Sequence, residues 1–99
     1  MDASDLKGAV ESQHGGIATH VESAPVKETF QGQTVWEGVV DVFDLEGNAK
    51  STRAYAWSSP IEGSDRRRIF AVLHLGAIRS PQDAVRAAIV AEHKSKTQD

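Results

Sequence analysis

The sequence predicts an α+β fold with an N-terminal helix, an antiparallel meander sheet of three or four strands, and a C-terminal helix. Three observations lead to this prediction. A helical apolar period occurs near each end of the chain, runs rich in β-branched residues fill the middle, and short glycine-containing links separate these runs. Because only the ends of the sheet carry helices, we expect both helices to pack on one sheet face.

The N-terminal helix is predicted over residues 4–16. A serine stands at its start as a capping residue, and Leu6, Ala9 and Val10 form one apolar stripe at helical spacing. The glycine pair at 15–16 is typical of a helix end.

Two extended segments joined by a short link follow this helix. Residues 17–30 are rich in β-branched side chains and contain Pro25. Because proline cannot donate a hydrogen bond to a strand ladder, we expect an edge strand or a bulge at this position. The link at 31–33 contains a glycine and predicts a hairpin turn, and residues 34–45 form the clearest strand in the chain.

The second half of the chain predicts two further strands. A glycine turn at 46–48 leads into a strand at 50–58. A longer loop at 59–65, which contains proline and glycine, separates it from the strand at 66–75.

A C-terminal helix is predicted over residues 79–94. Ser80 precedes Pro81, and Asp83 follows three positions after the serine, which is the pattern of a capping box. The apolar stripe of this helix consists of Val85, Ala88 and Ile89. Residues 95–99 are expected to fray, as chain ends do.

The composition indicates one small folded domain over residues 1–99, with an ordered core at about 4–94. Hydrophobic residues make up 39% and charged residues 25% of the chain, as in ordinary globular proteins. The absence of cysteine excludes a disulfide framework and a thiolate metal site. No apolar run approaches the roughly 18 residues of a membrane span, and the acidic N-terminal stretch is unlike an export signal. We therefore expect a cytoplasmic, bacterial-type protein without a membrane partner.

Charge is divided unevenly along the chain. Residues 1–49 hold two lysines and nine acidic residues, a net −7, whereas residues 50–99 hold nine basic and five acidic residues, a net +4. We expect the two halves to attract each other within the fold, although a basic binding face is the alternative. The isoelectric point of about 5.7 is low for a dedicated nucleic-acid-binding domain.

The strand pattern predicts one open sheet face. Helices pack most closely over small side chains, so we expect the alanines of the last two strands beneath the helices. This covered set is Ala54, Ala56, Ile69, Ala71, Leu73 and Leu75. Alternation then places aromatic and basic residues on the opposite face. The candidate binding residues on that face are Arg53, Tyr55, Trp57, Arg68, Phe70 and His74.

Three interpretations of this face stay open. Tyr, Trp and Arg are enriched at the energetic centres of interfaces, which favours a non-enzymatic interaction module that forms a homodimer or binds a protein partner. Aromatic rings between arginines also suit weak binding of single-stranded nucleic acid. Alternatively, Tyr55 and Trp57 point inward, because periodicity does not fix which strand face is buried and a one-residue bulge reverses it.

The arginine run at 66–68 is interpreted as structural. Successive strand residues alternate in direction, so Arg66 and Arg68 point one way and Arg67 the other. Charges at the start of an apolar strand also oppose edge-to-edge aggregation. Their expected partners across the sheet are the acidic residues Glu37, Asp41 and Asp44.

No motif predicts catalysis. The chain lacks a nucleophile-elbow serine motif and a glycine-rich phosphate loop. The four histidines, His14, His20, His74 and His93, match no compact ligand spacing. We therefore predict no catalytic residues, no metal and no cofactor, and the sequence favours a binding protein over a small-molecule enzyme.

Two resemblances accompany these patterns. The order of helix, antiparallel strands and helix resembles, in layout only, the double-stranded-RNA-binding fold. That family has a phosphate-binding lysine cluster where this chain reads RSPQDAV, so its activity is not implied. The segments QGQTVWEGVVDVFDL, YAWSSPIEG and SPQDAVRAAIVAEH resemble small uncharacterised bacterial proteins of similar length, over about residues 17–94. This second resemblance implies no activity.

Overall fold

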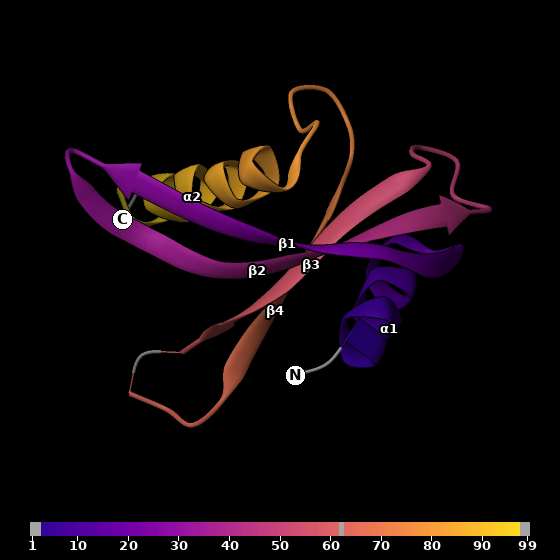
Figure 1. Cartoon of the computed structure of the whole chain (residues 1–99), viewed down its shortest axis with the longest axis horizontal. Helices are drawn as coiled ribbons and strands as arrows, with labels where there is room; N and C mark the ends of the chain where they lie inside the picture. Colours follow the sequence, from indigo (N-terminus) through magenta and orange to yellow (C-terminus); the bar gives the residue numbers. More distant parts are fainter. Residues whose placement is uncertain (1–2, 62, 98–99) are drawn as a thin grey trace.

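The computed structural model describes residues 3–61 and 63–97 and confirms the α+β class. The elements are α1 (Ala3–His14), β1 (Ile17–Phe30), β2 (Gln33–Glu46), β3 (Arg53–Pro60), β4 (Arg67–Leu73) and α2 (Pro81–Thr97). The four strands form one antiparallel sheet in the order β1-β2-β3-β4 (Figure 1). None of the helices within these ranges is long and apolar enough to cross a membrane.

Glycines make two of the chain reversals sterically allowed. The turn between β1 and β2 has positive φ at Gln31 (53°) and Gly32 (79°), as a tight hairpin turn matched to strand twist requires. Gly16, after α1, has a φ of 87°, and a Cβ there would lie 2.5 Å from the carbonyl oxygen of Glu46. The predicted hairpin link and helix end are both confirmed.

β1 is an edge strand, as Pro25 predicted. The proline pairs with Val39 in the ladder, and the two register shifts lie elsewhere, between His20 and Glu22 and between Glu28 and Thr29. At the first shift, the extra residue of β1 reverses which of its side chains point to each face of the sheet.

Helix α1 covers the small-residue face of the sheet. Leu6 and Val10 are buried against Ala54 and Ala56 of β3. The same cluster also contains Ala18, Phe43, Leu45 and Leu73. The small strand residues therefore lie under a helix, as expected, except that Leu75 is 44% exposed.

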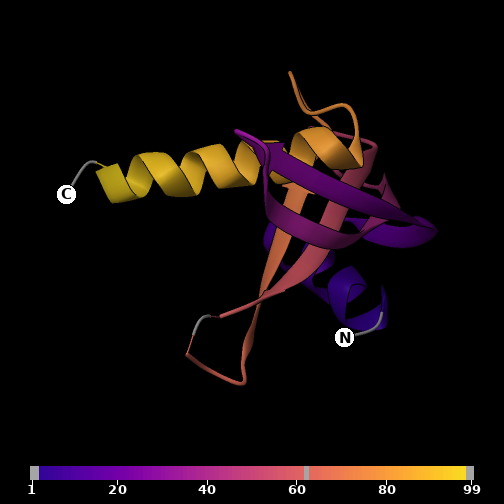
Figure 2. The ribbon, with the colours of Figure 1, turned by 60° about the vertical axis from the view of Figure 1, so that its left-hand side comes forward.

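Helix α2 covers the other face, so the prediction that both helices share one face is wrong. Ala84 and Val85 of α2 are buried with Tyr55 and Trp57 of β3, whose side chains alternate with Ala54 and Ala56. The views show α1 and α2 on opposite sides of the sheet (Figure 2). The physical reason is that β3 is apolar on both faces, and one layer of helices cannot remove both from water.

Helix α2 begins with the predicted cap but ends later than predicted. The Asp83 N–H bonds to the Ser80 Oγ at 3.1 Å and the Arg79 N–H bonds to the Asp83 carboxylate at 3.2 Å, so the predicted capping pair forms. The helix continues to Thr97, beyond the predicted end at 94. Of the tail predicted to fray, residues 98–99 lie outside the described residues.

The sheet forks because its central pairing is short. β1 and β2 pair along their whole length, and so do β3 and β4, but β2 pairs with β3 only from Asp41↔Ala56 to Asp44↔Arg53. Beyond Asp41 and Ala56 the two hairpins diverge, and Figure 1 shows them crossing at a wide angle. We call this opening the fork, and its paired, closed end the neck.

Candidate functional site

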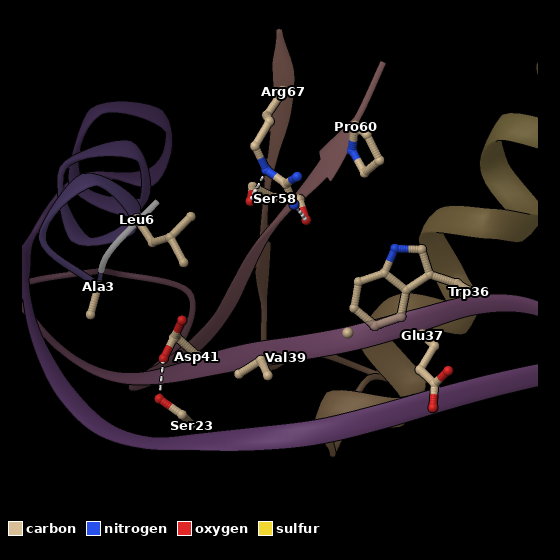
Figure 3. A pocket seen from close by; sticks show the side chains of 11 residues that line it. Ala3, Leu6, Ser23, Trp36, Glu37, Val39, Asp41, Ser58, Pro60 and Arg67 are labelled. Carbon is tan, nitrogen blue, oxygen red and sulfur yellow. Dashed lines mark hydrogen bonds between the residues drawn. The ribbon is translucent and has the colours of Figure 1, made fainter. Parts of the chain in front are cut away.

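A cleft of about 420 Å³ lies in the fork, within the size range of ligand pockets. It opens on the same side of the sheet as α1 (Figure 3). Five of the six elements contribute to its lining: Ala3, Leu6, Ser23, Trp36, Glu37, Gly38, Val39, Asp41, Ser58, Pro60 and Arg67. Residues distant in sequence meet here because the two hairpins separate around it.

Trp36 closes the floor of the cleft. Its indole lies back over Gly38, where an added Cβ would come within 2.9 Å of two ring atoms. The indole Nε1–H donates to Ser59 Oγ of β3 at 2.8 Å, which joins the two hairpins across the fork. Gly38 is therefore needed for the ring to adopt this position at the floor of the cleft.

Apolar side chains line the end of the cleft nearest α1. Leu6, in the helix core, and the exposed Val39 of β2 both contact it (Figure 3). Val39 is 52% exposed, although it lies in the middle of a strand, because α1 ends short of it. The site thus combines an aromatic floor with an apolar wall.

Arg67 is exposed at the cleft, and two hydrogen bonds orient its side chain. Its Nε–H donates to Ser58 Oγ at 2.9 Å and its Nη2–H to the Ser58 carbonyl at 3.1 Å (Figure 3). A guanidinium carries five N–H groups, so three stay available after these two bonds. Among the described residues, Arg67 has no carboxylate within ion-pair distance.

Asp41 lies at the neck and is already engaged by its own neighbours. Its Oδ1 accepts the Ser23 hydroxyl at 2.5 Å and lies 2.8 Å from His20 Nε2, while Ser23 Oγ is 3.3 Å from that same ring nitrogen. In a Ser-His-Asp triad the hydroxyl and the carboxylate engage different ring nitrogens. This arrangement therefore activates no nucleophile.

The outer edges of the sheet are protected, whereas the edge of β2 inside the fork is open. β1 carries Pro25, Lys27 and a bulge, which all disfavour pairing with another strand. On β4, the Ala71 carbonyl is 2.8 Å from His14 Nε2 of α1. Residues 33–40 of β2 pair with β1 on one side, and β3 does not pair with them on the other.

The predicted open face of aromatic residues is buried, so the expected exposure of its centre was wrong. Tyr55 is 1% and Trp57 2% exposed, since α2 packs on them. Phe70 is half-buried, and its ring stacks on Trp57 with centroids 5.1 Å apart. The structure agrees with the inward-facing alternative, because the aromatic side chains fill the space between sheet and α2.

The other members of the predicted set lie around this core. The Tyr55 hydroxyl is 2.6 Å from His74 Nδ1, and burial raises the pKa of the tyrosine. The guanidinium carbon of Arg68 lies 4.7 Å from the centre of the Phe70 ring, and its Nη1 is 3.5 Å from a Glu92 carboxylate oxygen of α2. Arg53 lies at the neck and bonds to Asp44 at 3.3 Å. The residues predicted to share a face do so, as part of the core and its rim.

The arginine run divides as predicted, although its predicted partners were wrong. Arg67 points to the cleft and Arg68 to the α2 side. Asp41 instead pairs with His20, and Asp44 with Arg53. Cross-strand register explains the difference: β2 ends its pairing with β3 at Asp41 and never neighbours β4.

The acidic and basic halves of the chain do meet in the fold. Arg86 of α2 donates to Glu28 of β1 at 3.1 Å, and Gln82 bonds to the same buried carboxylate. Arg53–Asp44 is a second contact between the halves. These contacts help to place α2 over β1.

No three His, Asp or Glu side chains converge as metal ligands in the described part of the chain. The chain matches no protein-family model, no curated protein and no solved structure. The cleft itself is therefore the feature from which a function can be inferred.

Sequence reasoning missed the cleft residues Trp36, Val39, Ser58 and Arg67 as a site. One signal was present, because the strand predicted at 34–45 is longer than the strand at 50–58, which leaves part of it without a partner. The direction in which the two hairpins diverge is set by tertiary packing and has no local sequence signal.

Proposed function

We propose that this protein is a non-enzymatic interaction module whose cleft binds an extended segment of a partner protein. The observation that carries the proposal is the open inner edge of β2. Pairing with β3 ends at Asp41↔Ala56, yet β2 continues to Gln33. On sequence grounds, we propose that the module acts in the cytoplasm of a bacterium.

An open strand edge presents backbone N–H and C=O groups that a partner strand can pair with. The Ser58 carbonyl on β3 is already occupied by Arg67, which leaves the β2 side of the fork as the template. Side chains of an added strand would alternate between the Trp36 floor and the open α1 side. Main-chain bonds would then supply affinity, and the aromatic floor and Val39 would supply selectivity.

The protected outer edges favour this site over edge-to-edge assembly. Pro25, Lys27 and the bulge oppose pairing at β1, and α1 covers part of β4. Homodimerisation stays a separate prediction, which light scattering over a concentration series measures. Binding of single-stranded nucleic acid through the aromatic set would require α2 to move away from Tyr55 and Trp57.

The two tryptophans give a built-in test. Trp36 forms the cleft floor, whereas Trp57 is buried in the core, so their indole N–H resonances separate binding from unfolding. We expect a pool of N-acetylated random tetrapeptides to shift the Trp36 signal more than that of Trp57, because Trp57 stays buried although its ring lies 6.3 Å from that of Trp36. Assignment uses Trp36→Phe.

A matched pool with N-methylated backbone amides is the control. It keeps the side chains but cannot donate ladder hydrogen bonds, so it should leave Trp36 unshifted. Equal shifts from both pools, or none from either, would contradict strand pairing at β2. A shift caused by an oligonucleotide instead would favour the nucleic-acid alternative.

A further inference from the structure

We infer that the cleft recognises the free C-terminal carboxylate of its peptide partner, and that Arg67 is the residue that binds it. This inference rests on the proposed function and names the partner of that same site. It is carried by a cation that Ser58 orients at the cleft, together with the closed end of the fork.

Arg67 is prepared for a carboxylate before any ligand arrives. Ser58 fixes the guanidinium through two hydrogen bonds, from Nε–H to Oγ and from Nη2–H to the carbonyl. Fixing a long side chain in advance removes part of the conformational entropy that binding would otherwise cost. The remaining N–H groups have the geometry that matches a carboxylate.

The neighbouring arginines differ from Arg67 in this respect. Arg68 already has Glu92 as an ion-pair partner and the Phe70 ring beneath it. Arg66 precedes β4 in the loop, outside the cleft lining. Among the described residues that line the cleft, Arg67 is thus the one cation.

The fork closes a short way beyond the Arg67 guanidinium, which reaches back to Ser58 from a β4 position opposite Pro60. Pairing of Asp41 with Ala56 seals the neck, and Ala3 and Leu6 of α1 lie beside it (Figure 3). Ser58, which holds the guanidinium, is two residues beyond Ala56, or roughly 7 Å along the strand. A ligand strand that enters from the open end and pairs with β2 cannot continue through the neck. The C-terminus of the ligand would therefore lie near Arg67.

Two carboxylates share the cleft with Arg67 and restrict how the ligand enters. Asp41 lies at the neck, where Ser23 and His20 already bond to its Oδ1. Glu37 lies farther toward the open end, opposite Lys27 in the β1–β2 register. The ligand carboxylate is accordingly placed on the β3–β4 wall, away from both acids.

The test compares the acetylated tetrapeptide pool as free C-terminal acids with the same pool as C-terminal amides. Affinity is read from the Trp36 indole shift of the full-length protein. We expect the amide pool to bind about tenfold more weakly, because a C-terminal amide cannot form the charge-assisted hydrogen bonds that a carboxylate forms with Arg67. Arg67→Gln should lower the affinity of the acid pool to that of the amide pool, and Arg66→Gln is the matched control that should change neither.

The outcomes separate the inference from the proposed function. If acid and amide pools bind equally while the N-methylated pool does not, carboxylate recognition is refuted and strand pairing stands. An amide pool ending in glutamate that binds as tightly as the acid pool would overturn recognition of the terminus in favour of a side chain. If no pool shifts Trp36, both proposals fail. An unmoved Trp57 signal in Arg67→Gln verifies that the variant is folded.

Discussion

The two faces of the sheet carry different kinds of side chain and have different degrees of cover. On the α2 face, large aromatic residues of β3 interlock with Trp36, Phe70 and the helix. On the α1 face, small residues allow the helix to approach closely, but α1 reaches only the neck and leaves Val39 exposed. The comparison teaches that the aromatic residues, which composition alone marks as a binding surface, build the core, while the binding surface arises where a short helix leaves the sheet uncovered.

Trp57→Ala should have the largest effect on stability, because it empties the centre of the α2 face. Removal of a buried aromatic side chain costs about 3–5 kcal/mol in the free energy of unfolding. Val39→Ala, on the uncovered part of the other face, should cost less than about 1 kcal/mol, since the side chain is half-exposed already. Urea denaturation of both variants measures the contrast. Equal losses would mean that the two faces are buried alike.

Gly38→Ala should have an intermediate effect, concentrated at the cleft floor. The added Cβ would lie 2.9 Å from the Trp36 ring, so the indole has to move at a cost of about 1–3 kcal/mol. We expect the Trp36 indole resonance to shift and its bond to Ser59 to weaken. Gly8→Ala is the control, because nothing lies within 4 Å of that helical position, and it should stabilise the protein by up to about 1 kcal/mol. Unchanged Trp36 signals in Gly38→Ala would contradict the described floor.

Tyr55→Phe should have a smaller effect than Gly38→Ala at neutral pH, about 1 kcal/mol, from loss of the hydrogen bond with His74. The pH dependence of the free energy of unfolding tests the role of Tyr55 more directly. Burial raises the pKa of Tyr55 above the ordinary 10.0, so the unfolded chain loses this proton at a lower pH than the folded protein. Stability should therefore fall as the pH rises from about 10 through the raised pKa. Tyr55→Phe should remove that part of the decline, and an unaltered alkaline profile would show that Tyr55 is not responsible.

The sequence was sufficient to predict the elements and their order. Periodicity located both helices, Pro25 indicated an edge strand, and the Ser80–Asp83 spacing identified the start of α2. These features depend on local backbone and side-chain chemistry, which neighbouring residues determine. The end of α2 was placed too early because helix ends carry weaker local signals.

Contacts between distant segments determine which sheet face each helix covers and where the cleft forms. Ala54 to Trp57 are all buried, so alternation within β3 could not distinguish the covered face from an open one. The arginine run that contains Arg67 is interpreted as structural from the sequence, since nothing in its own segment shows that Ser58 bonds Arg67 toward a cleft. The short β2–β3 register, which creates the fork, is a property of the packed sheet.

Amide hydrogen exchange along β2 tests the central claim most directly. The account predicts alternating protection over residues 33–40, where amides that face β1 exchange slowly and those that face the fork exchange fast. Over residues 41–44, where β2 is paired on both sides, every amide should be protected. Uniform protection along the whole strand would mean that the inner edge of β2 is already paired, and would contradict both the fork and the binding site proposed in it.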